Sequence, residues 1–231
     1  METSAVAQSA SDRYPQVASP VHTILVLAVL GGWSFWHKIS AEELSVAANP
    51  NRIRFYLETV VYEWLLFVLV VARPSSSFSE IIGVSFSQVL LDIGIAVAFW
   101  IVAALLLWIF GWLLRVAALG RNVSMLPQRC IELTVWIALS ITAGICEETI
   151  FRGYLQRQFM ALTKSAPVGI LLSAATFGAA HAYQGSRMMI LIALYGAMFG
   201  ILAYWRGTVR PGMISHAWQD SLNGVLAVLK H

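Results

Sequence analysis

The 231 residues are 58% hydrophobic and only 12% charged, with a formal net charge of +3 and a mean hydropathy of +0.72. An ordinary soluble domain carries roughly 25% charged residues, so this composition excludes a water-soluble globule and predicts a chain surrounded mostly by lipid. The basic residues stand singly between apolar runs, as at helix ends near lipid headgroups, so nucleic acid is not an expected partner.

The N-terminal part of the chain combines a polar stretch with an apolar one. Residues 1–16 are rich in Ser and Ala and are interpreted as a polar tail. The apolar stretch that follows, to about residue 36, is interpreted as a retained first membrane segment rather than a signal peptide, because no small-x-small cleavage site follows it and more apolar segments do. Residues 17–231 are therefore predicted to form a single transmembrane domain.

Segments long and apolar enough to cross a bilayer, which takes about 20 residues, recur along the chain. They lie near residues 18–36, 55–72, 89–114, 131–150, 166–184, 187–205 and 211–229. Open strands cannot satisfy their backbone groups in hydrocarbon, so each segment is predicted to be an α-helix. The expected fold class is all-α, a polytopic transmembrane helical bundle of about seven spans. The expected location is a membrane, the cell membrane if the source is bacterial. Loop lysines and arginines are too evenly spread to assign an orientation.

The first half of the chain holds few ionisable side chains within its spans. Glu58 and Glu63 lie five positions apart in the second span and so on different helix faces, while His22 and Asp92 lie near span ends. A charge inside a membrane costs about 2.5 kcal/mol or more, so each such residue needs a partner or a function. For these four residues we expect interfacial placement or helix packing.

The second half begins with two adjacent acids at the far end of an apolar run, Glu147 and Glu148, followed by Arg152. Neighbouring residues on an α-helix diverge by about 100°, so the two carboxylates should have different roles. Glu148 and Arg152 are four residues apart and can pair on one face. We therefore expect Glu147 to face an interior cavity. A charged helix end paired only for stability is the alternative.

Two histidines follow on the next hydrophobic segments. His181 lies in a stretch of small residues that lets helices approach closely, where a histidine can equally be a hydrogen-bonded core residue. His216 and Asp220 have the i, i+4 spacing that places imidazole and carboxylate on one helical face. Asp220 could orient His216 and fix its tautomer, or the two residues could form half of a metal site.

These motifs together resemble the family of CAAX prenyl endopeptidases and bacteriocin-processing proteins, abbreviated CPBP and also called the abortive-infection family. The resemblance covers about residues 131–224. The three motifs occur in the family's order on hydrophobic segments: Glu-Glu-x-x-x-Arg at Glu147, Glu148 and Arg152, Phe-x-x-x-His at Phe177 and His181, and His-x-x-x-Asn/Asp at His216 and Asp220.

The resemblance implies an intramembrane glutamic endopeptidase that hydrolyses a peptide bond of a membrane-associated or lipidated peptide or protein. Glu147 would be the general base for water, and His181 would help to hold that water. Glu148 and Arg152 would brace the site, while His216 with residue 220 would stabilise the oxyanion. Many relatives have Asn at the last position, so the role of Asp220 differs: we expect it to orient His216.

Two other functions remain open. Glu147, His181, His216 and Asp220 could bind Zn²⁺, which would make the protein a zinc-dependent metallopeptidase, although the chain has no HExxH motif. No other cofactor is implied. Alternatively, the polar cluster could only fasten helices in a non-enzymatic immunity or scaffold protein. Cys146 beside Glu147 is not expected to be a nucleophile, because a buried thiol is inert.

Overall fold

The computed structural model of the chain describes residues 14–46, 51–72, 79, 82–83, 88–116 and 125–230, and all the regular secondary structure in these residues is helical. This confirms the all-α prediction. Residues 1–13 of the predicted tail lie outside the described residues. The helices are α2 (Pro20–Val46), α3 (Arg52–Val71), α5 (Val89–Leu113), α6 (Cys130–Glu147), the π-helix η3 (Glu148–Gln156), α7 (Arg157–Thr163), α8 (Ala166–Ala180), the 3₁₀ turn η4 (Ala182–Gln184), α9 (Ser186–Arg206) and α10 (Arg210–Val228).

Each predicted span corresponds to a helix, with differences at the ends and in helix type. The first helix continues through a polar segment to Val46, because a helix can continue beyond the apolar stretch that identifies it. The fourth continues through η3 and α7 to Thr163, where an end near residue 150 was expected. The expectation of an α-helix in every span is wrong for η3, since hydrophobicity does not report the hydrogen-bond register.

Four of the described helices are long and apolar enough to cross a membrane: α2, α5, the continuous helix 130–163 and α9. The α8 helix is apolar but shorter. Only Asp92, Ala96 and Ala103 are buried along α5, so nearly all of this very apolar helix faces outward. A surface of this kind needs a lipid solvent, and the chain is an integral membrane protein.

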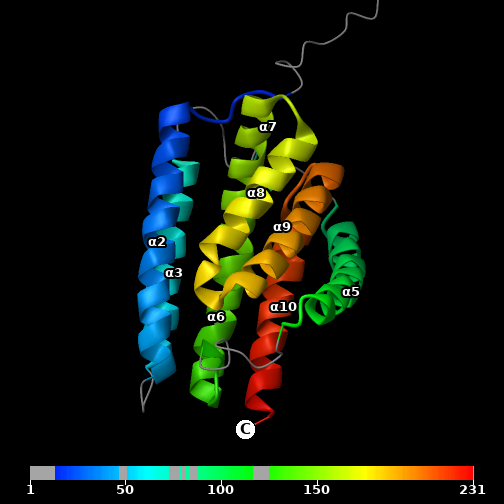
Figure 1. Cartoon of the computed structure of the whole chain (residues 1–231). Coiled ribbons are helices and arrows are strands. Elements are labelled where there is room, and N and C mark those ends of the chain that lie inside the picture. The colour runs from blue at the N-terminus through cyan, green and yellow to red at the C-terminus, as the bar shows by residue number, and fades with distance from the viewer. Residues whose placement is uncertain are drawn as a thin grey trace, which may run out of the picture.

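The continuous helix formed by α6, η3 and α7 runs through the middle of the bundle (Figure 1). On one side it packs against α3, with α2 beyond, and on the other it packs along α10. The α8–α9 hairpin lies across it, and α5 contacts α9 and α10 at the edge. Every residue of η3 is buried, so the central helix is enclosed where the π-helix begins.

Two glycines allow close approach of the helices that surround the predicted site. A Cβ atom added at Gly144 of α6 would lie 2.6 Å from the carbonyl oxygen of Met213 on α10. A Cβ atom at Gly178 of α8 would lie 2.6 Å from the carbonyl oxygen of Met189 on α9. Close approach of this kind is characteristic of helix packing in membranes. It brings α10 against α6 and α9 against α8.

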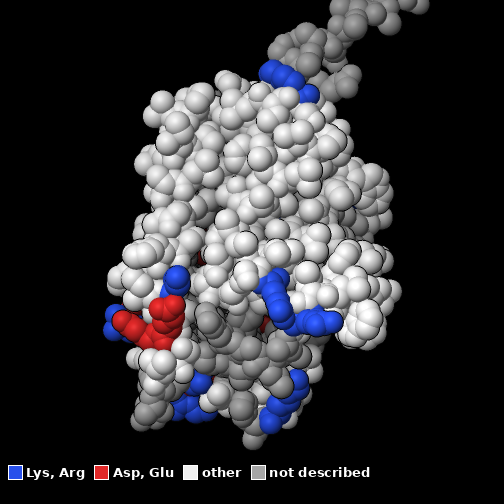
Figure 2. All heavy atoms as spheres, in the orientation of Figure 1, with Lys and Arg blue, Asp and Glu red and all other residues white. Residues whose placement is uncertain are grey.

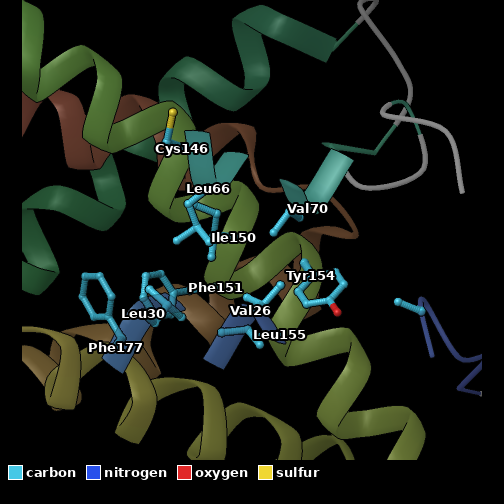
Figure 3. Close-up of a cluster of buried hydrophobic side chains, with 11 residues drawn as sticks. Val26, Leu30, Leu66, Val70, Cys146, Ile150, Phe151, Tyr154, Leu155 and Phe177 are labelled. Carbon is cyan, nitrogen blue, oxygen red and sulfur yellow. The ribbon is translucent and has the colours of Figure 1, made fainter. Parts of the chain in front are cut away.

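A buried hydrophobic cluster holds the π-helix in position (Figure 3). Ile150, Phe151 and Leu155 of η3 pack with residues of α2, α3 and α8, among them Leu66 and Phe177. Burying a large apolar side chain contributes about 1.5–3 kcal/mol in water. In lipid the same contacts act through close packing, which fixes the orientation of the polar residues on the other faces of η3.

Charged and apolar side chains are segregated on the outside of the bundle. Figure 2 shows a small basic group at the upper end of the visible face, a mixed charged group in its lower part, and a broad uncharged region between them. Large apolar side chains such as Leu90, Trp108 and Trp205 are exposed. For three ionisable residues of the first half we expected interfacial placement or helix packing, and their contacts agree. Glu58 pairs with Arg54, and Asp92 pairs with Arg206 and Arg210. His22 contacts Tyr154.

Candidate active site

Glu148 and Arg152 form a buried ion pair at the start of η3. The Nη1 atom of Arg152 donates to Oε1 of Glu148 over 2.9 Å, and both side chains are almost completely buried. The other terminal nitrogen of Arg152 donates to the carbonyl oxygen of Gly196 on α9, at 3.2 Å. The guanidinium also lies 4.3 Å from the ring centroid of Phe177 on α8. Arg152 therefore ties three helices together around Glu148, as the predicted brace requires.

Glu148 also contacts His216 of α10. The Nδ1 atom of His216 lies 3.1 Å from Oε1 of Glu148, the same oxygen that accepts from Arg152. A Cβ atom at Gly212, one turn before His216, would lie only 2.9 Å from the other carboxylate oxygen, so a glycine is needed for this approach. The ion pair keeps Glu148 an acceptor, so Nδ1 of His216 is the donor and Nε2 faces away.

Glu147 points to a different side of the helix and lines an internal cavity, as its position next to Glu148 predicts. Its Oε1 lies 3.8 Å from Nε2 of His181, and its Oε2 lies 3.6 Å from Nε2 of His216. Both distances are longer than a direct hydrogen bond and are compatible with a bridging water. One carboxylate thus lies between the two imidazoles that the motifs supply.

His181 is the C-cap residue of α8, where the apolar helix ends before η4. Its Nδ1 lies 2.9 Å from the carbonyl oxygen of Phe177 one turn earlier. A carbonyl can only accept, so Nδ1 carries the proton of this hydrogen bond. In the neutral ring Nε2 is then a hydrogen-bond acceptor that faces Glu147. The helix end fixes both the tautomer and the direction of the ring.

Asp220 lies one turn after His216 on α10 and lines the same cavity. Its Oδ2 is 3.5 Å from Nε2 of His216, the nitrogen that also faces Glu147, and its side chain is partly exposed. We expected Asp220 to orient the imidazole. Because Nε2 of His216 faces the cavity, the residue that orients the ring must contact Nδ1, and that residue is Glu148. The geometry therefore favours Glu148 for that role.

The cavity has a volume of about 660 Å³ and is lined by residues from both halves of the chain. Apolar side chains of α2, α3, α5, α9 and α10 form most of its wall, among them Leu30, Leu66, Leu107, Ile192 and Leu226. Its polar lining includes Glu147, His181, His216 and Asp220. A cavity of this size can hold several residues of a peptide or one lipid chain.

Several polar residues of this cavity were not predicted to belong to it, and Glu63 is the acidic one among them. Glu63 of α3 was expected at an interface or in helix packing, but it is 6% exposed and lines the cavity. It lies on the inward face of α3 with Thr59 and Leu66, at the spacing of one helical stripe. The spacing of these three residues was the sequence signal that could have placed Glu63 on the inward face of the helix. Cys146, by contrast, is fully buried in the hydrophobic cluster and does not line the cavity.

The fit of these residues to a metal ion can be judged from their arrangement. Among the described residues, no group of three or more His, Cys, Asp or Glu side chains is arranged to hold a metal ion. In the donor pairs around Glu147, His216 and Asp220, the oxygen and nitrogen atoms are 3.5–3.8 Å apart. No step of the proposed reaction is derived through a metal.

The fold and the site define a class of protein: a polytopic membrane protein with a carboxylate and two histidines facing an enclosed cavity. Residues 130–222 match the family model described as type II CAAX prenyl endopeptidase Rce1-like. The matched segment contains all six predicted site residues, and its similarity supports the assignment to the CPBP family and to CAAX-type membrane proteases. Searches of curated proteins and of solved structures gave no significant match.

Proposed function

We propose that this protein is an intramembrane endopeptidase that cleaves a peptide bond of a membrane-associated or lipidated substrate with water activated by Glu147. The observation that carries the proposal is the position of the Glu147 carboxylate, 3.8 Å from Nε2 of His181 and 3.6 Å from Nε2 of His216, on the wall of a cavity. In this arrangement Glu147 is the base, Nε2 of His181 is a hydrogen-bond acceptor and Nε2 of His216 is a donor.

In the first step a water molecule bridges Glu147 and His181. The carboxylate takes one proton of the water while the oxygen attacks the carbonyl carbon of the scissile bond, which produces a tetrahedral oxyanion. Nε2 of His181 accepts the second hydrogen of the water and orients a lone pair toward the carbonyl, because Nδ1 already donates to Phe177. No covalent bond to the protein forms in this step.

The oxyanion is stabilised by His216. When both ring nitrogens carry a proton, Nδ1 donates to Glu148 and Nε2 donates into the cavity, so the ring presents a positive charge to the developing negative one. The tetrahedral intermediate then collapses, the C–N bond breaks, and Glu147 returns its proton to the leaving amine. The products are a carboxylic acid, which keeps the second hydrogen of the water until it ionises in solvent, and a free amine, and Glu147 is again ionised.

The ion pair of Glu148 and Arg152 supports this chemistry by preorganisation. Arg152 is fixed by Gly196 and by the ring of Phe177, so Glu148 cannot shift when the charge on His216 changes. A donor that is already oriented costs no reorganisation at the moment of reaction. Glu148 and Arg152 are therefore positioning residues that act through His216.

The test is cleavage of membrane-associated and prenylated peptides by the purified protein in detergent, with wild type compared to the Glu147→Ala variant. We expect new peptide termini with wild type only. Equal product from both proteins would show that Glu147 is not the base. No product from either protein across the peptide set would favour the non-enzymatic immunity or scaffold function.

A further inference from the structure

Glu63 lies in the cavity without a cationic partner. Its side chain belongs to α3, outside the segment that matches the family model, and its Oε2 is buried with no hydrogen-bond partner among the described residues. None of the ion pairs formed between described residues includes Glu63. A carboxyl group inside a membrane bundle needs a partner or a function, and the described residues supply no partner.

The other buried acids outside the cavity are neutralised by arginine. Asp92 pairs with Arg206 and Arg210 at 3.0 and 2.7 Å. Glu132 pairs with Arg129 at 2.7 Å, and Glu148 with Arg152 at 2.9 Å.

The cavity differs from these sites. Its lining contains Glu63, Glu147 and Asp220, whereas its one lysine or arginine among the described residues is the exposed Lys230 at the end of α10, and its three histidines, His37, His181 and His216, form no ion pair with Glu63. Glu147 and Asp220 face histidines, and Glu63 does not. The bundle therefore forms an acidic cavity in which one carboxyl group has no cationic partner among the described residues.

Aromatic rings line the same cavity as Glu63. Trp33 of α2 and Tyr62 of α3 stack with centroids 3.7 Å apart and an angle of 5° between their planes, and both line the cavity. Phe55 and Tyr183 belong to the same lining. The faces of aromatic rings attract ammonium and guanidinium groups, most strongly where water is excluded. A buried carboxyl group beside aromatic walls is suited to a cation rather than to a purely apolar group.

We propose that Glu63, with the aromatic wall of Trp33 and Tyr62, forms a subsite for a lysine or arginine side chain of the substrate peptide. The inference rests on the proposed peptidase function, which it deepens by naming a chemical class of substrate. A basic side chain that enters the cavity supplies the missing cation and buries its apolar stem against the aromatic rings. A neutral side chain in its place leaves Glu63 unpaired. The first half of the chain thus selects the substrate, and the second half cleaves it.

The experiment uses a peptide series in which each position around the cleaved bond carries lysine, acetyl-lysine or norleucine in turn. At one position we expect wild type to cleave the lysine peptide about 10- to 100-fold more efficiently than either neutral peptide, measured as kcat/KM, with most of the difference in KM. The isosteric Glu63→Gln variant should lose this preference while it still cleaves the neutral peptides. Glu58→Gln, on the outward side of the same helix, is the matched control and should keep the preference.

Cleavage of neutral peptides by Glu63→Gln also shows that this variant is folded. Equal cleavage of the lysine and acetyl-lysine peptides at every position by wild type would overturn the proposal, whatever the variant does. A preference that persists in Glu63→Gln would overturn it too.

Binding separates the subsite from the peptidase function. Fluorescent lysine and norleucine peptides are titrated against Glu147→Gln and against the double variant Glu147→Gln, Glu63→Gln. A lysine preference that only the first protein shows supports the subsite even if wild type cleaves nothing. Cleavage without any lysine preference leaves the peptidase function standing and removes the subsite.

Discussion

The Nδ1 atom of His216 lies 3.1 Å from Oε1 of Glu148, so the two adjacent glutamates approach opposite edges of one imidazole ring, Glu148 at Nδ1 and Glu147 at Nε2. Two neighbouring acids on one helix can do this because their side chains diverge around the axis. Glu148 fixes the ring at Nδ1, and Nε2 remains available to the substrate. Each prediction about the glutamates follows from this division.

Glu147→Gln should abolish cleavage without destabilising the protein. Glutamine keeps the size of the side chain and can still form hydrogen bonds, but it cannot take a proton from water. We expect kcat/KM to fall by about 100-fold or more. The thermal midpoint in detergent should stay that of wild type, because Glu147 takes part in no buried arginine pair. Full activity of this variant would contradict the assignment of the base.

Glu148→Gln, unlike Glu147→Gln, should lower the stability of the protein as well as its activity. The amide leaves Arg152 as an uncompensated charge in the interior, and removing one partner of a buried pair costs about 3–5 kcal/mol. We expect a clear loss of stability, measured as the free energy of unfolding in mixed detergent micelles, together with reduced cleavage. Glu58→Gln, which breaks an exposed pair with Arg54, is the control and should leave stability unchanged. A Glu148→Gln variant as stable as wild type would show that the pair is not needed for the fold.

Asp220→Asn should retain most of the activity. The carboxylate lies 3.5 Å from Nε2 of His216, but the ring is oriented by Glu148 at Nδ1. Asparagine fits the same space and can donate to an oxyanion, which a carboxylate cannot. We expect kcat to stay within about 3-fold of wild type, since only a partly exposed contact is changed. A loss comparable to that of Glu147→Gln would show that the negative charge of Asp220 is required.

Zinc chelators should not inhibit cleavage. The proposed reaction uses only water and protein side chains, and among the described residues no set of three donors is arranged to hold a metal ion. Activity is measured after incubation with a chelator and dialysis, with and without added Zn²⁺. Inhibition that added Zn²⁺ reverses would instead support the metallopeptidase.

Gly144→Ala should destabilise the bundle, whereas Gly94→Ala should not. The new methyl group at Gly144 would lie 2.6 Å from the carbonyl oxygen of Met213 and would force α10 away from α6. Overpacking of this kind costs about 1–3 kcal/mol. Gly94 on α5 has no atom within 4 Å of the added methyl group, so it is the matched control. Both unfolding free energies are measured in the same micelles, and cleavage by Gly144→Ala should fall because α10 carries His216.

Composition and motif spacing were sufficient to predict the membrane fold and to name the candidate site residues. Composition excludes a soluble globule, and the apolar segments predict each helix to within a few residues at most ends, because the bilayer imposes one length and one type of backbone on a span. The order of the three motifs and the spacing of Glu148 and Arg152 were sufficient to name the six residues that the structure brings around one cavity and its supporting ion pair.

Which atom of each side chain faces the cavity depends on how the helices pack, and the sequence did not show this. The spacing of His216 and Asp220 is correct for a pair on one helix face, but Glu148, far away in sequence, lies closer and takes Nδ1. Hydropathy could not predict the π-helix, because it reports how apolar a segment is and not which carbonyl each N–H reaches. Nor could it place Glu63: whether a carboxyl group on a membrane helix faces lipid, another helix or a cavity depends on what packs against that helix.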